Sequence, residues 1–311
     1  MTKLNRGEKL LRKAKTIIPG GNQLLSKRSE RFLPVLWPSY YIKAKGCSVW
    51  DIEHKRYYDF AGMGVTSCAL GYSDPDVNKA IKRALDKGSM STLNCIEEIE
   101  LAKKLIEIHP WSKMVKFARS GGEACSIAIR IARTYSKKNV VLFCGYHGWH
   151  DWYLSSNISN KRNLDNQLLP ELKSNGIPKN LSKTALPFEY NNINSFLDQF
   201  NKNKKKIGAV IMEPLRSDLP KKEFLKTIRK VTKENGVPLI FDEITSGFHD
   251  NLGGIHLKLK INPDIAIFSK ALGNGTPIAA IIGKKSIMDF AQDSFISSTM
   301  WTERIGFIAA L

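Results

Sequence analysis

The sequence lacks the features of secreted and membrane proteins. Near the N-terminus, Lys9, Arg12 and Lys13 interrupt every stretch in which the apolar region of a signal peptide would lie. No window approaches the roughly 18 apolar residues that a membrane-spanning helix needs, and the longest apolar runs are as short as residues 278–282. We therefore expect a cytoplasmic protein without a membrane partner.

Cysteine is sparse and follows no metal-binding or disulfide pattern. The five cysteines are widely spaced and form no CxxC pair, so neither a disulfide framework nor a zinc knuckle is indicated. We expect reduced, mostly buried thiols. The GxGxxG and GxxxxGK[ST] spacings are also missing, so the sequence does not support a dinucleotide site or a Walker-type nucleotide site.

Negative charge is scarce relative to positive charge. The 311 residues carry a formal net charge of +19, and such an excess can attract nucleic acids or other anions. The lysines are spread along the chain, however, and the densest run, residues 202–206, lies among asparagines. We interpret the charge mainly as a solvated basic surface that also draws an anionic cofactor or acidic substrate, and we predict no nucleic-acid partner.

A hydrophobic content of 42% over this length predicts one large domain with smaller appendages. Apolar spacing predicts a helix over residues 7–18, within an N-terminal arm of residues 1–45. Alternating apolar and polar residues from position 46 onward predict a small β meander, which we place at residues 46–75. Residues 76–311 then form the large α/β domain.

Short apolar runs alternate with helical patterns in the large domain. The predicted strands are residues 115–118, 140–143, 209–213, 239–242 and 265–269. The predicted helices are residues 76–87, 96–108, 123–135 and 222–234. This alternation predicts a mainly parallel sheet with helices on both faces, and a ligand at the carboxyl ends of the strands. Residues 155–182 are polar without periodicity, so we predict a long loop beside that site.

A glycine-rich turn lies between a predicted strand and a predicted helix. Ser120, Gly121 and Gly122 occupy this turn, where backbone N–H groups can approach an anion at the positive end of the helix. The turn is a candidate phosphate cradle. Ordinary turn chemistry explains the same residues, and this pattern alone does not decide between the two.

Two predicted strands end in ionisable side chains. Asp242 and Glu243 end the first, where one carboxylate could pair with a cationic ring nitrogen, cap a helix or bind a metal ion. Lys270 ends the second and is followed by a glycine-containing turn. Desolvation and neighbouring positive charge would lower the pKa of such a lysine, making it a nucleophile that forms a Schiff base with an aldehyde.

Aromatic side chains follow the predicted strand 140–143. Tyr146 and His147 lie where a flat cofactor could stack. The competing interpretation is a metal site formed by His147, His150 and Asp151. The sequence offers no matching cluster of ligands elsewhere, so we predict no metal.

Taken together, the strand ending in Asp-Glu and the strand followed by Ser-Lys-x-x-Gly-Asn-Gly resemble the class III (ω-type) aminotransferases. Residues 18–21, Ile-Pro-Gly-Gly, are similar to the glutamate-1-semialdehyde 2,1-aminomutase-like branch. The resemblance covers nearly the whole chain. It implies the fold of type I pyridoxal-phosphate (PLP) enzymes, which is aspartate-aminotransferase-like. Family members continue past Leu311 into a C-terminal small domain, so we expect that this domain is missing and the chain is truncated.

The resemblance also implies residue roles. Lys270 would hold PLP and carry the substrate proton, Asp242 would pair with the pyridine nitrogen, and Tyr146 would stack on the ring. The implied cofactor-binding residues are Ser120, Gly121, Gly122, Tyr146, His147, Glu213, Asp242, Lys270 and Thr299.

Thr299 matches a threonine that contacts the phosphate of the neighbouring subunit, which implies a homodimer with shared active sites. Its alternative role is a helix N-cap for a segment beginning near Thr302. Two residues depart from the family pattern. His249 stands in place of an arginine, and Phe307 in place of a proline or small residue.

The implied function is transfer of an amino group between a small-molecule amino donor and a carbonyl acceptor. Residues 145–153 and 298–304 resemble aminotransferases of amino-sugar or surface-polysaccharide metabolism more than aminomutases. The alternatives are intramolecular amino transfer by an aminomutase-type isomerase and a truncated, non-catalytic PLP-binding remnant. The retained Lys270 and Asp242 argue against the remnant, and the expected loss of the small domain argues for it.

Overall fold

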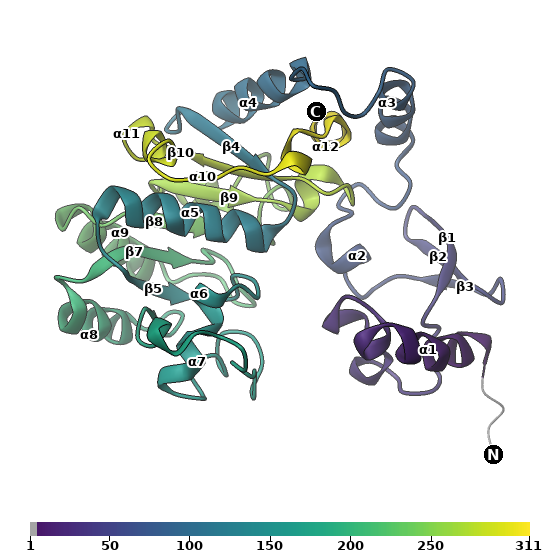
Figure 1. Cartoon of the computed structure of the whole chain (residues 1–311), viewed down its shortest axis with the longest axis horizontal. Helices are drawn as coiled ribbons and strands as arrows, with labels where there is room; N and C mark the ends of the chain where they lie inside the picture. Colours follow the sequence, from purple (N-terminus) through teal and green to yellow (C-terminus); the bar gives the residue numbers. More distant parts are fainter. Residues whose placement is uncertain (1–4) are drawn as a thin grey trace. The chain divides into compact units, whose positions relative to one another are not determined.

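A computed structural model of the chain describes residues 5–311. The chain divides into two compact units, one ending at Ala80 and one running from Ile81 to Leu311. We describe them separately (Figure 1). The domain boundaries at residues 45 and 75 stay predictions. Within residues 5–311, no helix combines the length and the apolar character that crossing a membrane would require.

The first unit begins with helix α1 (Arg6–Ile17), whose N-cap is Asn5. Its three-stranded antiparallel sheet follows the order β1-β2-β3. The strands are β1 (Tyr41–Lys45), β2 (Ser48–Asp51) and β3 (Arg56–Tyr58), and the short helix α2 (Met63–Thr66) follows them. Helix α3 (Pro75–Leu85) contains the division between the two units. The sheet thus starts at Tyr41, whereas the sequence pattern predicted a start at position 46. Strand β1 is largely exposed on both sides. Its sequence therefore has no strong alternation of apolar and polar residues that would have predicted it.

The second unit contains a seven-stranded sheet of order β4-β10-β9-β8-β7-β5-β6. Its strands are β4 (Met114–Ala118), β5 (Val140–Cys144), β6 (Ala185–Pro187), β7 (Ile207–Met212), β8 (Leu239–Asp242), β9 (Ile265–Phe268) and β10 (Ala279–Gly283). Strand β10 runs antiparallel to β4 and β9, whereas the pairs from β9 to β6 are parallel. The mainly parallel sheet is confirmed.

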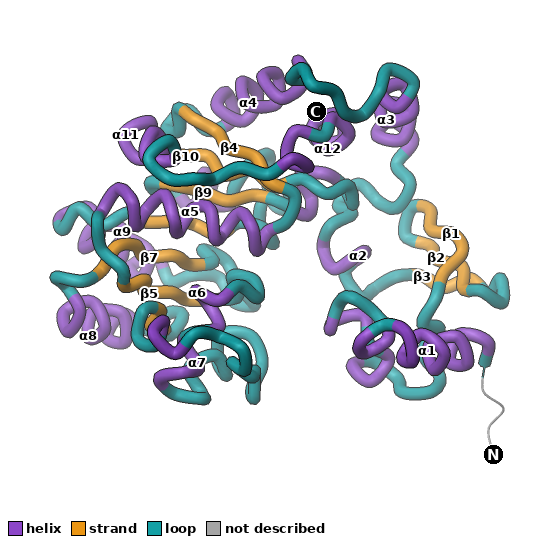
Figure 2. Tube along the Cα trace, viewed as in Figure 1, coloured by secondary structure: helices purple, strands orange, loops and turns teal. Residues whose placement is uncertain are grey.

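Helices and loops connect the strands (Figure 2). The helices of this unit are α4 (Ile96–Ile108), α5 (Gly121–Ser136), α6 (Asp151–Leu154), α7 (Ser156–Ser159), α8 (Ile193–Asn203), α9 (Lys222–Glu234), α10 (Ile255–Leu259), α11 (Lys285–Met288) and α12 (Arg304–Ala310). Residues 155–182 are mostly loop, as predicted, apart from α7 and a 3-10 turn at Lys179–Leu181.

The two faces of the sheet bury different side chains of the same strands. Helix α5 lies across one face (Figure 1), where Ile240 of β8 joins its core cluster. Phe241, the next residue, packs in the cluster of α8 and α9 on the other face. Both faces are apolar because successive side chains of a strand point to opposite sides and helices cover each side. The fold is therefore α/β with helices on both faces, as predicted.

Candidate active site

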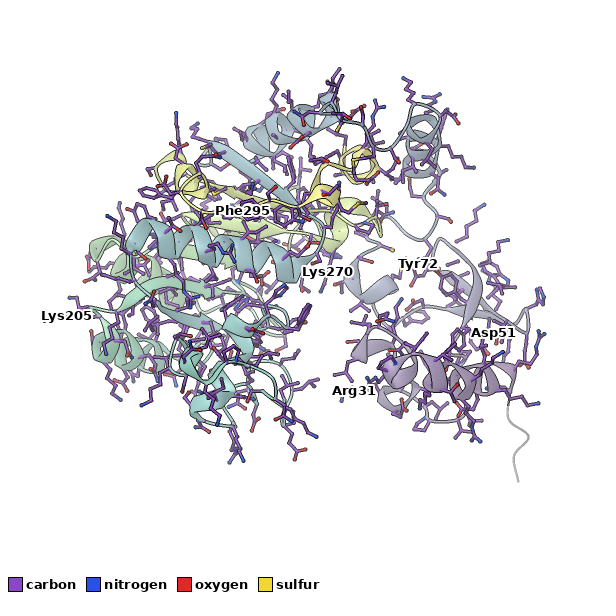
Figure 3. The ribbon with its side chains drawn as sticks, in the orientation of Figure 1. Arg31, Asp51, Tyr72, Lys205, Lys270 and Phe295 are labelled. Atoms are coloured by element: carbon purple, nitrogen blue, oxygen red, sulfur yellow. The ribbon has the colours of Figure 1, made fainter. Side chains whose placement is uncertain are left out.

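The ionisable side chains predicted to act together lie at one edge of the sheet. Asp242 is the last residue of β8, and Lys270 follows β9 in a 3-10 turn (Lys270–Gly273). Asp242 pairs in parallel register with Ile267 of β9, so both strands present their carboxyl ends at this edge. Figure 3 shows Lys270 at one end of the sheet and Lys205, which precedes β7, at the other.

Three hydrogen bonds hold the buried Asp242 carboxylate, which is 3% exposed. Oδ2 accepts from His147 Nδ1 at 2.7 Å and from the Cys125 thiol on α5 at 3.3 Å. Oδ1 accepts from the Ile244 N–H at 3.1 Å. A carboxylate offers about four acceptor positions. One position on Oδ1 is therefore left for a further donor.

The Lys270 amine combines strained backbone with partial desolvation. The residue has φ +47°, a left-handed conformation that is uncommon outside glycine and often marks functional sites. Its Nζ donates to Thr245 Oγ1 at 2.9 Å. Burial lowers the pKa of Lys270, and the negative charges of Asp242 and Glu213 only partly oppose that shift. More of the amine is then in its nucleophilic form than in an ordinary lysine.

Glu213 follows β7 at the same edge. Its Oε2 accepts from the Tyr146 N–H at 3.1 Å and lies 3.4 Å from Arg216 Nε. Burial, and then the charge of Asp242, raise the pKa of Glu213. Its side chain thus ties the segment that carries Tyr146 to the end of β7. The Tyr146 residue is 41% exposed, so its side chain is accessible to a ligand.

The N-terminus of α5 meets these strand ends. A Cβ on Gly121 would lie 2.7 Å from Ile244 Cδ1, and one on Gly122 would lie 2.9 Å from His150 Cε1, so neither position accommodates a side chain without a shift. The Ser120 hydroxyl is engaged in a capping box with Glu123. The first N–H groups of a helix have no intrahelical acceptor. The backbone, rather than the Ser120 side chain, is thus available to an anion.

The predicted alternative metal set is not brought together among residues 5–311. His147 instead joins Cys125 and Asp242, whose potential ligand atoms lie within 4.8 Å of one another and could hold a metal ion. Both the thiol and the imidazole already contact the same Asp242 oxygen. Burial and the Asp242 charge raise the pKa of the Cys125 thiol, which disfavours the thiolate that metal binding needs.

Thr299 begins a 3-10 turn (Thr299–Thr302) and is exposed. Among residues 5–311, no hydrogen bond links its side chain to the strand ends described above. The helix that follows is capped by Glu303, whose carboxylate accepts from Ile305 N at 2.7 Å and Gly306 N at 3.3 Å. The alternative role of Thr299 as this N-cap is therefore wrong.

The two departures from the family pattern lie in different environments. Phe307 is fully buried, and its ring meets Phe117 edge-on with centroids 5.0 Å apart. The larger side chain thus fills core space. His249 is exposed in the turn after β8.

Two contacts at the site were missed by sequence reasoning. Cys125 lies on the buried face of α5, one helical turn after Gly121 and Gly122, and that spacing was a usable signal. Thr245 lies in an irregular turn after Asp242, where no periodicity indicates which side chain reaches Lys270.

The family model for class III aminotransferases matches residues 34–305. The chain belongs to this family. It is 37% identical over 287 residues to the glutamate-1-semialdehyde 2,1-aminomutase of Nitrosopumilus maritimus, covering 90% of this chain and 65% of that protein. It is 32% identical over 317 residues to the 3-aminobutyryl-CoA aminotransferase of Cloacimonas acidaminovorans, covering 99% and 72%. The chain thus spans about two thirds of the length of these relatives.

Solved structures of transaminases have the same fold. An omega-transaminase from Sphaerobacter thermophilus superposes with a TM-score of 0.87 at 25% identity, covering 98% of this chain and 71% of that one. The FumI protein of Sphingopyxis sp. MTA144, solved as its PLP internal aldimine form, gives a TM-score of 0.86 at 26% identity with the same coverage. The fold is therefore that of type I PLP-dependent enzymes, as predicted.

The residues at the strand edge fit pyridoxal phosphate, the cofactor of this family. Asp242 has an open acceptor position for a protonated ring nitrogen. Lys270 has an amine that could react with the aldehyde, and the backbone at Gly121 and Gly122 has N–H groups that could bind the phosphate. Each of three chemical groups of the cofactor therefore has a suitable potential partner on this chain.

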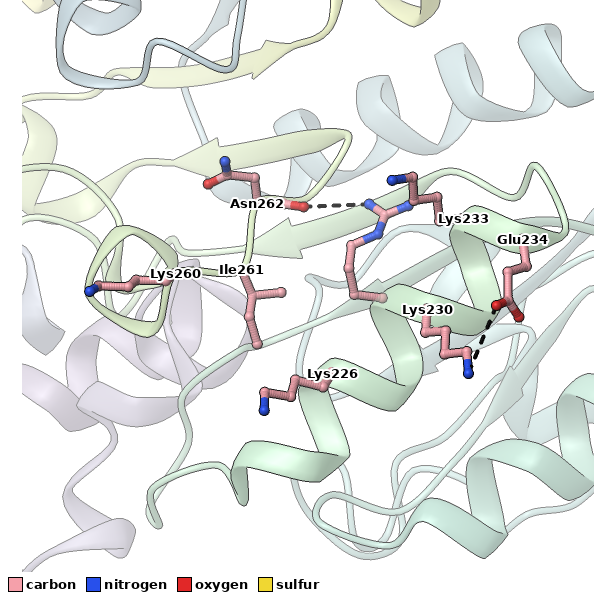
Figure 4. A pocket seen from close by; sticks show the side chains of 8 residues that line it. Lys226, Lys230, Lys233, Glu234, Lys260, Ile261 and Asn262 are labelled. Carbon is pink, nitrogen blue, oxygen red and sulfur yellow. Dashed lines mark hydrogen bonds and ion pairs between the residues drawn. The ribbon is translucent and has the colours of Figure 1, made fainter.

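A basic hollow lies at the other edge of the sheet (Figure 4). It is lined by Lys226, Arg229, Lys230, Lys233, Glu234, Lys260, Ile261 and Asn262. These residues come from α9 and from the segment before β9. They lie at the amino ends of the parallel strands, where ligands of open α/β sheets do not usually bind. The hollow belongs to the basic surface and not to the candidate site.

Proposed function

We propose that this chain transfers an amino group between a small-molecule amino donor and a carbonyl acceptor, with Lys270 holding pyridoxal phosphate. One observation carries this proposal. A lysine amine with a lowered pKa lies at the same strand edge as a buried aspartate that keeps one open acceptor position. Membership of the class III aminotransferases supports the reaction type.

Bound pyridoxal phosphate supplies an electron sink for the electron pair left when a substrate C–H bond breaks. The Asp242 carboxylate would hold the ring nitrogen in its protonated form, and His147 and Cys125 keep that carboxylate in place. The Lys270 amine would hold the aldehyde group of the cofactor and would take up or deliver a proton. Backbone N–H groups at Gly121 and Gly122 would orient the phosphate, and Tyr146 would cover a face of the ring.

Intramolecular amino transfer is a second candidate. The relative named an aminomutase is 37% identical to this chain, against 32% for the relative named an aminotransferase. Both reactions use a PLP-bearing lysine and a ring-nitrogen partner, so Lys270 and Asp242 support either. An amino-sugar or surface-polysaccharide substrate stays a prediction, because neither name refers to a sugar.

We also infer a homodimer in which Thr299 serves the partner's site. The exposure of Thr299 and the capping of α12 by Glu303 support this inference, because they leave the hydroxyl without a role in the described unit. A cytoplasmic location stays a prediction as well.

Borohydride labelling tests the proposed function. The protein should be yellow with PLP, and reduction should fix the cofactor to the peptide that contains Lys270. Lys270→Ala should remove both the label and amino transfer. Lys205→Ala is the matched control at the opposite edge of the sheet and should change neither. Labelling of any other lysine contradicts the assignment, whereas a labelled Lys270 without transfer to any carbonyl acceptor supports a non-catalytic remnant.

A further inference from the structure

A second polar cluster lies behind Asp242, on the other side of β8. We call it the Glu243 cluster, and it consists of His109, Trp111, Glu243, Ser246 and His256. Glu243 and both histidines are fully buried, and Ser246 is nearly so. Glu243 is adjacent to Asp242, so the alternation of a strand turns its side chain away from α5 and toward α10.

The Glu243 carboxylate fills all of its acceptor positions. Oε2 accepts from Ile255 N at 2.6 Å and from Ser246 Oγ at 3.0 Å. Oε1 accepts from His256 N at 3.0 Å and from His256 Nδ1 at 2.6 Å. Four donors match the roughly four lone-pair sites of an ionised carboxylate. This side chain therefore has no capacity for a ligand and joins three segments firmly.

Hydrogen-bond geometry assigns the roles of the ring nitrogens in the two histidines of the cluster. His256 Nε2 accepts from Trp111 Nε1 at 2.9 Å, so its proton is on Nδ1, facing Glu243. His109 Nε2 accepts from Gly254 N at 3.2 Å, and its Nδ1 faces the Leu105 carbonyl at 2.8 Å. Burial lowers the pKa of His109 to about 4. Both histidines therefore accept a hydrogen bond through Nε2 and face an acceptor through Nδ1.

Two hydrogen bonds join Glu243 to the turn that contacts the lysine. Ser246 Oγ and Gly247 N both bond back to Glu243, through its carboxylate and its carbonyl. Thr245 lies inside this closed turn, and its hydroxyl accepts from Lys270 Nζ at 2.9 Å. The other charged groups acting on that amine are Asp242, from β8, and Glu213, which follows β7.

We propose that Glu243 is a positioning residue. By holding the 243–247 turn from the buried side, it keeps the Thr245 hydroxyl against the Lys270 amine and so sets the proton affinity of that amine. The inference rests on the proposed function only in treating Lys270 as the cofactor lysine. Thr245 stabilises the ammonium form because its oxygen accepts the hydrogen bond.

The test measures the proton affinity of Lys270 in the full chain without bound PLP. Acetic anhydride is the probe, and mass spectrometry of the Lys270 peptide gives the acetylation rate as a function of pH, with Lys205 as the internal control. Thr245→Val removes the acceptor and should lower the pKa of Lys270 by about one unit, a tenfold change in the amine-to-ammonium ratio. Thr245→Ser should restore the wild-type value.

The coupling to Glu243 is tested by two further variants. Glu243→Gln should lower the pKa of Lys270 in the same direction, and combining it with Thr245→Val should give the value of Thr245→Val alone, because both act through one hydrogen bond. Ser246→Ala removes only one of the four donors, so it decides the question if Glu243→Gln does not fold.

Folded variants at Glu243 and Ser246 with a wild-type Lys270 pKa would overturn the proposal. Additive shifts in the double variant, or no shift in Thr245→Val, would overturn it too. Failure of the wild-type chain to bind PLP would count against the proposed function alone, because acetylation of Lys270 does not require the cofactor.

Discussion

Asp242 and Glu243 are adjacent and both buried, yet their carboxylates have different surroundings. Asp242 shares the α5 face with Ile240 and accepts three hydrogen bonds. Glu243 shares the opposite face with Phe241 and accepts four. One carboxylate keeps an open acceptor position, and the other is saturated.

The same contrast extends to the neighbours of each carboxylate. On the Asp242 side, His147 Nε2 and His150 Nδ1 are buried without a hydrogen-bond partner. On the Glu243 side, the polar side-chain atoms of His109, Trp111 and His256 all have partners. Unused hydrogen-bonding capacity in a buried site is costly unless a ligand fills it. The α5 side of β8 therefore has hydrogen-bonding capacity for a ligand, whereas these three side chains on the Glu243 side have used theirs.

The largest expected effect is on the Asp242 side. Asp242→Asn keeps the shape of the side chain but removes the charge that pairs with the ring nitrogen. Losing one electrostatic partner of the developing charge typically costs about 2.7–4 kcal/mol, so the amino-donor half-reaction should slow about 100- to 1000-fold while PLP still binds. Stopped-flow absorbance measures this rate. A half-reaction near the wild-type rate would remove Asp242 from its role.

Glu243→Gln should act mainly on the stability of the fold. The amide cannot accept all four hydrogen bonds, and leaving buried donors unpaired should lower the free energy of unfolding by about 3 kcal/mol. Urea unfolding of this variant beside Asp242→Asn provides the comparison. If Asp242→Asn destabilised the fold more than Glu243→Gln, the division of roles between the two carboxylates would be wrong.

The Glu243 side should also be sensitive to acid through His109. Its pKa is about 4 in the folded chain and about 6.5 when unfolded, so the unfolded chain binds more protons between these values. Stability is therefore lost as pH falls from about 6.5 to about 4, by about 3 kcal/mol. His109→Gln should flatten this part of the stability profile, measured by urea unfolding at several pH values. An unchanged slope would show that other groups cause it.

The smallest expected effect lies outside both carboxylate networks. Thr299→Ala should weaken PLP binding about ten- to a hundredfold, as for loss of one hydrogen bond to a charged group, with Ser298→Ala as the matched control. Mixing Lys270→Ala chains with Thr299→Ala chains should restore roughly a quarter of the tight sites in a twofold dimer. If the chains exchange but no site that binds PLP tightly is restored, Thr299 does not act across the subunit interface.

Much of the fold could be predicted because the apolar periodicity is strong where elements are buried. The helices at Ile96–Ile108 and Lys222–Glu234 and the strand Leu239–Asp242 begin and end at the predicted residues. Strand β10 was not predicted, although residues 278–282 were noted as an apolar run. It runs antiparallel between two other strands, and a short apolar run alone does not indicate such a position.

The candidate site could be predicted only in part. That Asp242 and Lys270 lie at the same strand ends could be predicted, because parallel strands present their carboxyl ends at one edge. The Glu243 cluster could not be found, because Trp111 and His256 are far apart in sequence and only the packing of α10 brings them together. The predicted Ser120 contact with the cofactor stays a prediction, and the structure adds that this hydroxyl forms a capping box with Glu123.

The central claim is that Asp242, and not Glu243, keeps the cofactor's ring nitrogen protonated. Loading the chain with PLP labelled with ¹⁵N in the ring, and recording the ¹⁵N NMR signal, measures that protonation directly. We expect a protonated nitrogen in the wild-type protein and in Glu243→Gln, and a neutral nitrogen in Asp242→Asn. A neutral nitrogen in the wild-type protein, or a protonated one in Asp242→Asn, would contradict the account.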